Sequence, residues 1–356
     1  MCEALDRLLA AIPGVRVTVD RFGNRLARIS RGETHGSPVA FIAHLDHPGF
    51  ILPEGAYPHS GTDRVFEMLF EGRVATEFFA GSYIRLFRSA DDTGISARIL
   101  ETTEELPEIG ARRVTVEAAE SPEGTVLAMW DVPVFEAGED GFLRARVCDD
   151  LAGCAALVES LRRLSASDAT QLDYTVIFTR AEEAGFCGLL CLLSEELPAG
   201  LGPDTLYLSV ETSGETPGVS LGGGAIIRCG DRSTTFDGGI VDLLAGLTAA
   251  NGINARRALM DRGTCEATPV ARAGLRAGGV CIPVRNYHNQ DLAKRTIAPE
   301  AVSIADAEAL VAMMVSLGIA CGEGTQPKSI ILHDYDQYLR KGQNSLAPLP
   351  LAAQRA

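Results

Sequence analysis

Short, continuous apolar runs alternate with helical segments through most of this 356-residue sequence, and this alternation restricts the fold more than any other feature. The apolar runs lie at 38–43, 173–179, 205–210 and 278–284. Such a run is typical of a strand that is buried on both faces. Helical patterns lie between and after these runs, at 151–164, 187–197, 240–252 and 299–318. We therefore expect an α/β fold with a mostly parallel sheet and helices on both faces.

The stretch from 51 to 145 has a different pattern. Short alternating segments such as 83–87 and 112–118 are separated by Gly, Pro and Asp clusters, and no long helical period occurs. This pattern predicts a small antiparallel, barrel-like β domain inserted into the α/β domain. The predicted domains are a discontinuous catalytic α/β domain at 1–50 and 146–345, the insert at 51–145, and a flexible tail at 346–356.

Composition excludes several classes of partner. The 47 acidic residues exceed the 32 basic residues, which gives a net charge of −15 that repels nucleic acids and anionic membranes. No apolar run approaches the roughly 20 residues that cross a bilayer. The first residues lack the basic segment of a signal peptide. Nine cysteines fit neither a paired disulfide framework nor a CxxC zinc motif. We expect a cytoplasmic protein without nucleic-acid or membrane partners.

Polar side chains that can bind metals follow each apolar run. In open α/β sheets, ligands bind beyond the carboxyl ends of the strands. His44 and Asp46 follow the first run, Glu182 and Glu183 the second, Glu211 the third and His288 the fourth, while Asp149 and Asp150 directly precede the helix at 151–164. The sequence therefore predicts that these side chains meet at one edge of the sheet.

Each of these residues also has an ordinary structural explanation. Asp149 or Asp150 could cap a helix, and Glu182 and Glu183 could complement a helix dipole. The histidines could be hydrogen-bonded core residues, and Glu211 could face water. So many carboxylates at one edge would nevertheless repel one another unless cations compensated them. We therefore favour a metal site.

Two imidazoles and three carboxylates suit two divalent ions, most simply Zn²⁺, with Co²⁺ and Mn²⁺ as alternatives. Each ion could take one His, one private carboxylate and one shared carboxylate. A water that bridges the two ions would have a pKa near 7 and would supply a hydroxide nucleophile. Of Glu182 and Glu183, one can bind metal and the other can act as general base. Asp46 is placed to accept the second ring proton of His44.

Five segments resemble motifs of the M42 family of co-catalytic metallopeptidases, within the wider M20/M28/M42 group. The segments are AHLDHPGF at 43–50, CDDLAG at 148–153, FTRAEEAGFCG at 178–188, CGDRSTTFD at 229–237 and IPVRNYH at 282–288. They follow the family's order, and the β insert lies at the expected place. The resemblance implies a zinc-peptidase-like fold and a homo-oligomer, between a dimer and a dodecamer.

The resemblance also implies a role for each residue. Asp149 would bridge both metals and would precede a cis peptide bond to Asp150. Glu183 and His288 would complete one metal site. His44 and Glu211 would complete the other. Glu182 would be the general base, and Asp46 would orient His44.

Some positions depart from the family pattern. His47 and Pro48 replace an acidic residue and its neighbour, Leu151 replaces an Arg, and Glu211 stands where an Asp is usual. The pair Cys265 and Glu266 also differs. None of these departures removes a ligand type or the general base, so we still expect hydrolysis, whereas the choice of substrate can differ from that of the family.

The expected function is removal of N-terminal residues from short peptides by a dinuclear aminopeptidase. An N-acyl amino-acid deacylase could use the same chemistry on a different amide. A metal-binding but inactive scaffold is a third alternative. The presence of Glu182 disfavours the scaffold, because assembly does not require a general base.

Overall fold

The computed structural model describes residues 2–53, 64–89, 92–103, 106, 111–122, 124–326 and 340–341. The predicted tail at 346–356 lies outside these residues, as does most of 327–345. Domain boundaries within those segments stay predictions.

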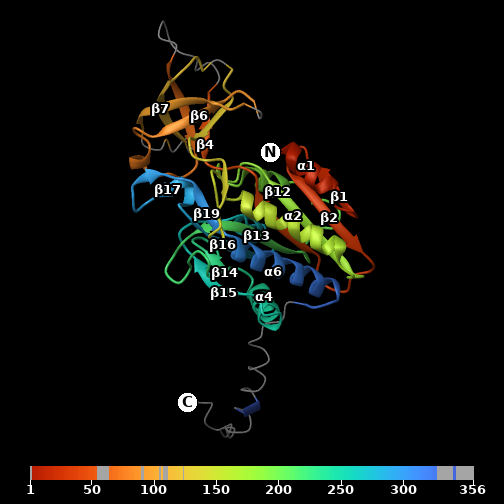
Figure 1. Ribbon diagram of the computed structural model, residues 1–356. Helices are drawn as coiled ribbons and strands as arrows, with labels where there is room; N and C mark the ends of the chain where they lie inside the picture. The colour runs from red at the N-terminus through yellow and green to blue at the C-terminus, as the bar shows by residue number, and fades with distance from the viewer. Residues whose placement is uncertain are drawn as a thin grey trace, which may run out of the picture.

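An 11-stranded sheet forms the centre of the larger domain (Figure 1). Its four central strands are parallel and adjacent in space: β12 (Leu172–Thr179), β3 (Val39–His44), β13 (Leu206–Gly214) and β16 (Arg276–Arg285). These strands contain the four apolar runs of the sequence. Their parallel pairing brings their carboxyl ends to one edge, as predicted.

Except for the parallel pair of β14 and β15, the strands that flank this core pair antiparallel, so the description "mostly parallel" holds for the core of the sheet. On one side lie β2 (Arg25–Arg31) and β1 (Val15–Val19). On the other side, β16 is followed by β19 (Glu300–Ser303), β11 (Phe142–Ala145) and β10 (Phe135–Ala137). Two further strands, β14 (Ala225–Asp231) and β15 (Ala255–Met260), branch from β16.

Helices cover both faces of the sheet. Phe41 on β3 packs into a core formed with α1 (Cys2–Ala10), α2 (Leu151–Ala166), α4 (Gly238–Ala250) and α6 (Ile304–Gly322). Its neighbours Ala40 and Ile42 point to the opposite core, which includes α3 (Cys187–Leu193) and α5 (Ala267–Arg272). This alternation along β3 explains its continuous apolar sequence, because every side chain meets a helix layer.

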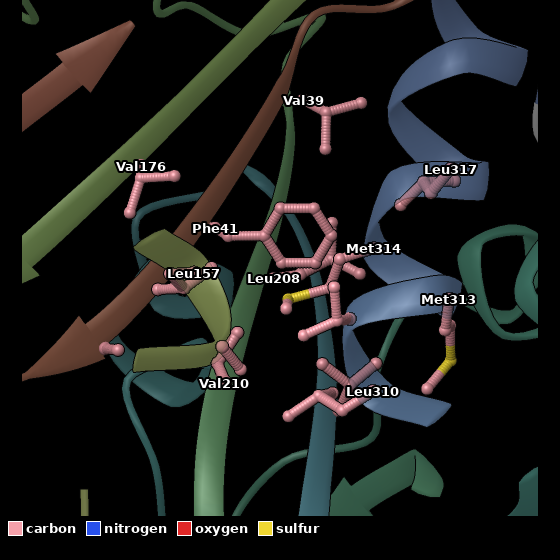
Figure 2. Packing of buried hydrophobic residues seen from close by; sticks show 14 of the residues in the cluster. Val39, Phe41, Leu157, Val176, Leu208, Val210, Leu310, Met313, Met314 and Leu317 are labelled. Atoms are coloured by element: carbon pink, nitrogen blue, oxygen red, sulfur yellow. The ribbon is translucent and has the colours of Figure 1, made fainter. Parts of the chain in front are cut away.

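Helix α6 is 19 residues long and apolar enough to cross a membrane by length and composition, contrary to our expectation that no such run exists. It is a core helix in this fold. Leu310, Met314 and Leu317 are fully buried against the sheet, where Figure 2 shows them beside Phe41 and Leu208. Packing on the sheet explains its apolar composition.

The inserted segment forms a closed barrel. Its strands are, in spatial order, β4 (Gly49–Ile51), β5 (Val65–Glu71), β8 (Ala111–Ala118), β7 (Ile95–Thr102), β6 (Tyr83–Phe87) and β9 (Leu127–Trp130). Adjacent strands pair antiparallel, and a short 3₁₀ turn, η1 (Thr76–Phe78), follows β5. The last two strands of the predicted insert, β10 and β11, instead extend the main sheet.

The sequence after His288 also differs from our prediction. A 3₁₀ turn, η2 (Tyr287–Asn289), leads into a hairpin of β17 (Gln290–Asp291) and β18 (Thr296–Ile297). The predicted helix at 299–318 was wrong in its first turn, because Glu300 to Ser303 form β19 and the helix begins at Ile304. Ser303 caps the helix by accepting a hydrogen bond from the backbone N–H of Asp306.

Candidate metal centre

The five predicted ligands come from five segments and meet at the carboxyl edge of the central strands. His44 ends β3, Glu211 lies within β13, and Asp149 directly precedes the residue that caps α2. Glu183 follows β12, and His288 lies in η2 just after β16. Three overlapping groups each have potential ligand atoms within 4.8 Å of one another. They are His44–Asp149–Glu211, Asp149–Glu183–His288 and His44–Glu182–Glu183.

Asp149 lies between the two imidazoles. Its Oδ1 is 3.5 Å from Nε2 of His44, and its Oδ2 is 3.4 Å from Nε2 of His288. Oε1 of Glu183 is 3.0 Å from the same Nε2 of His288. A carboxylate with one oxygen toward each histidine has the arrangement of a ligand shared by two cations. The peptide bond from Asp149 to Asp150 is cis.

The donor atoms in this cluster fit a pair of cations. Asp149, His44 and His288 are at most 2% exposed, and Glu211 is 7% exposed. Among the described residues, Oδ1 of Asp149 and Nε2 of His288 have no hydrogen-bond partner. Buried polar atoms are normally paired, because burial without a partner costs free energy. Divalent cations would satisfy both atoms, and the donor types are those that Zn²⁺ and similar ions prefer.

Burial and mutual attraction shift the pKa values of the cluster. Burial alone would lower the pKa of His44 and of His288, but the neighbouring carboxylates raise both well above the ordinary value. Burial would raise the pKa of Asp149, yet the adjacent imidazoles of His288 and His44 hold it below the ordinary value. Without metal, protonated imidazoles therefore supply the positive charge. Metal binding must displace these protons.

Glu182 and Glu211 respond differently. Burial raises the pKa of Glu211 to about 7, and burial also raises the pKa of Glu182 well above its ordinary value. The position of Glu182 beside His44 and Glu183 suits either a general base or a further ligand. Its role as the base stays a prediction.

Asp46 contacts His44 through a different atom than we expected. Nδ1 of His44 lies 3.1 Å from the backbone carbonyl oxygen of Asp46, whereas the Asp46 carboxylate is 3.9 Å away. The carboxylate instead accepts hydrogen bonds from the backbone N–H groups of Glu182 and Glu183, each at 3.0 Å. Asp46 thus fixes the His44 tautomer with its main chain and holds the Glu182–Glu183 pair with its side chain.

Several residues around the ligands were absent from the sequence-based set. Glu300 and His47 contact the main chain of Asp149, and the backbone carbonyl of Arg73 in the barrel accepts a 2.7 Å hydrogen bond from Nδ1 of His288. His47 lies in the same motif as His44, so the sequence could have indicated that His47 is near the site. A backbone carbonyl such as that of Arg73 leaves no trace in a sequence.

A cavity of about 410 Å³ opens beside the ligands. Glu211, Arg228 and Tyr287 line it from the main sheet and the turn after it. Leu292, in the hairpin, lines another wall. The cavity is large enough for a small substrate group next to the metal centre.

The fold and this cluster together define a metal-dependent α/β peptidase. A family model described as M42 glutamyl aminopeptidase matches residues 111–303. This chain therefore belongs to the M42 peptidase family, whose members are metal-dependent. The prediction of a peptide hydrolase of the aminopeptidase type is confirmed.

Solved structures with a similar fold include three aminopeptidases or peptidases. The Pyrococcus horikoshii TET1 peptidase, which can assemble into a tetrahedron or a large octahedral shell, is 18% identical, with a TM-score of 0.69 over 89% of this chain and 92% of its own. The TET aminopeptidase of a marine sediment Thaumarchaeota archaeon is 18% identical, with a TM-score of 0.67 over 89% and 88%. Yeast aminopeptidase 1 is 14% identical, with a TM-score of 0.64 over 95% and 94%.

Proposed function

We propose that this protein is a two-metal aminopeptidase that removes N-terminal residues from short peptides. The observation that carries the proposal is the position of Asp149, which directs one carboxylate oxygen to His44 and the other to His288. Glu211 and His44 would complete one metal site, and Glu183 and His288 the other. Zn²⁺ is the ion that we expect in both sites.

The protein's own residues would perform the remaining tasks. The two cations would supply Lewis-acid polarisation of the scissile carbonyl and would acidify a water molecule. Glu182 would accept a proton from that water and return it to the departing amine. The Asp46 carboxylate holds the backbone of Glu182 in place for this transfer. The cavity beside Glu211 and Arg228 would receive the N-terminal side chain of the substrate.

The test is a substrate panel with protein that has never met a chelator. Aminoacyl anilides and N-acetyl amino acids should be compared at equal concentration, and the bound metal should be counted by elemental analysis. We expect two divalent ions per chain and hydrolysis of the anilides alone. Activity should disappear after dialysis against a chelator and return with Zn²⁺, Co²⁺ or Mn²⁺.

The panel also distinguishes the alternatives. Hydrolysis of the N-acetyl amino acids alone would identify a deacylase. Bound metal without hydrolysis of either class would identify a scaffold. Full activity in metal-free protein would contradict the metal mechanism altogether.

We further propose a homo-oligomer. Related structures include a dodecamer and a tetrahedral shell, and β10 is an outer strand of the sheet whose residue Phe135 is 59% exposed. Its neighbour Val134 is 69% exposed. An edge strand with exposed apolar side chains is suited to contact another copy of the chain. Light scattering should give a mass of at least two chains, and a monomer would contradict the proposal.

We also propose a cytoplasmic location, without nucleic-acid or membrane partners. All nine cysteines are free thiols, and five of them are buried. Free thiols are usual in a reducing compartment. Fractionation of the native host cell, with detection by an antibody, would test this assignment.

A further inference from the structure

Glu300 connects the main chains of two predicted metal ligands. Its Oε2 accepts hydrogen bonds from the backbone N–H groups of Cys148, at 2.7 Å, and Asp149, at 2.9 Å. Its Oε1 accepts a hydrogen bond from the backbone N–H of His288 at 2.8 Å. One carboxylate at the start of β19 thus accepts three main-chain hydrogen bonds from two distant segments of the chain.

The opposite side of the Asp149 peptide is also held. Nδ1 of His47 lies 2.6 Å from the backbone carbonyl oxygen of Asp149, and Nε2 of His47 lies 3.1 Å from Oδ1 of Asn289. Asn289 follows His288 directly and donates to the backbone carbonyls of Arg146 and Ala298. The main chains of Asp149 and His288 are therefore linked twice, by Glu300 and through His47.

A purely structural explanation does not account for this carboxylate well. Glu300 is fully buried and lies near the Asp149 carboxylate, and both features disfavour a negative charge at this position. A carboxylate in such a place is retained at a cost to stability. The three hydrogen bonds of Glu300 fix the distance between the main chains of Asp149 and His288. That distance decides whether Asp149 and His288 can bind the same ion.

We propose that Glu300 is a positioning residue whose carboxylate sets the spacing of Asp149 and His288, and with it the affinity of the metal site that they share with Glu183. This inference rests on the proposed two-metal function. The other site, formed by Asp149 with His44 and Glu211, has only one ligand that Glu300 holds. Loss of the Glu300 carboxylate should therefore weaken the two sites unequally.

The test measures metal binding in the full-length protein by competition with a chelator of known affinity. In Glu300→Gln, an NH₂ group replaces one carboxylate oxygen. This group cannot accept a hydrogen bond from the backbone N–H that faces it. We expect the affinity for one of the two ions to fall by about 10- to 100-fold, the usual effect of removing a group that orients metal ligands. The other ion should bind with a change of less than about threefold. Residual turnover at saturating metal should show a lower kcat and an unchanged KM.

Asp306→Asn is the matched control. Asp306 is a buried carboxylate six residues further along the chain, and it accepts hydrogen bonds from the backbone N–H groups of Gly222 and Gly224. It contacts no proposed ligand. The substitution should lower the thermal stability while leaving both metal affinities unchanged.

The outcomes separate this inference from the proposed function. Two ions bound by Glu300→Gln with wild-type affinities would overturn the positioning role, as would an equal loss of metal affinity in Asp306→Asn. If Glu300→Gln fails to fold, Glu300→Asp keeps the charge but shortens the side chain, and it should show the same selective loss of one ion. Wild-type protein without any divalent metal would refute the proposed function itself, and the inference with it.

Discussion

The carboxyl edge of the sheet and the interior of the barrel are both buried, but they are filled in opposite ways. At the sheet edge, Asp149, Glu211 and His288 are surrounded by other ionisable groups, and some of their atoms have no partner among the described residues. In the barrel, Phe50, Phe70 and Trp130 pack ring against ring, with centroids 4.9–5.8 Å apart.

The two regions therefore depend on different sources of stability. The barrel core gains free energy from apolar burial and aromatic contacts, which require nothing from outside the chain. The sheet edge loses free energy through desolvated charge, and protons or cations must compensate that loss. The comparison indicates that the barrel is stable by its own packing, whereas the sheet edge requires protons or cations to compensate its buried charge.

The largest expected effect concerns the sheet edge alone. Glu182→Gln should lower turnover by about 10²- to 10⁴-fold, because the amide cannot accept the proton of the attacking water. Metal content, measured by elemental analysis, should stay at the wild-type value. The exposed Glu196, which follows α3, provides the control, since Glu196→Gln should retain full turnover. A loss of one ion in Glu182→Gln would instead show that Glu182 is a ligand.

The next effect concerns the barrel alone. Phe70→Ala should lower the free energy of unfolding by about 3–5 kcal/mol, because Phe70 is fully buried among aromatic rings. Denaturant titration would measure this change, and Tyr83→Ala, at a side chain that is 55% exposed, should cost less than about 0.5 kcal/mol. Metal content should be the same in both variants. A loss of metal in Phe70→Ala would show that the two regions are less separate than the comparison implies.

Removal of metal offers a direct contrast between the regions, because Trp130 is the protein's single tryptophan and lies in the barrel core. A chelator should lower the unfolding midpoint measured by circular dichroism, since a tightly bound ligand stabilises by about 3–4 kcal/mol at 100 to 1,000 times its Kd. The midpoint measured by Trp130 fluorescence should fall less. Equal shifts by both probes would mean that sheet and barrel unfold together.

The last effect is the pH dependence of the metal-free protein. Burial raises the pKa of Glu211 to about 7 and that of Glu266 to about 8, from an ordinary value of 4.5. The native state then keeps protons that the unfolded chain releases above pH 4.5, so stability falls as the pH rises from about 4.5 to about 8. The raised pKa values of His44 and His288 act in the same direction, because their stabilising charge is lost on deprotonation.

We expect the metal-free protein to lose on the order of a few kcal/mol of stability between pH 5.5 and pH 8, measured by denaturant titration. Metal-loaded protein should show a smaller loss, because ion binding already requires deprotonated His44, His288 and Glu211, and only Glu266 would still titrate in this range. Metal-free Glu211→Gln should show a weaker dependence than the wild type. A metal-free protein that becomes more stable toward pH 8 would contradict these pKa shifts.

The sequence predicted the residues that meet at the sheet edge better than the residues that support them. His44, Glu183 and His288 could be found because parallel strands end at one edge of a sheet, so that residues after successive apolar runs must converge. Glu300 was missed because its segment was read as the first turn of a helix, whereas it forms a strand. The contact of Asp46 with the His44 ring was assigned to the wrong atom, since a carbonyl oxygen is present at every residue and carries no sequence signal.

For the fold as well, some features were predicted from the sequence and others were not. The hydrophobic pattern located the four central parallel strands and the antiparallel character of the insert, because burial on two faces or one face leaves a distinct period. It did not reveal that β10 and β11 leave the barrel for the main sheet, because pairing partners depend on distant parts of the chain. The short hairpin of β17 and β18 is too brief to leave a period.

The hydrogen bond from His288 to the carbonyl of Arg73 has a practical meaning for protein engineers. No side-chain replacement at position 73 can delete that carbonyl acceptor. A change that displaces the segment between β5 and η1, such as a graft or a shortened loop, would remove the hydrogen bond. Chimeras that exchange barrels between homologues should therefore be judged by whether the transplanted loop reaches the imidazole, and a mismatched one would weaken catalysis from outside the catalytic domain.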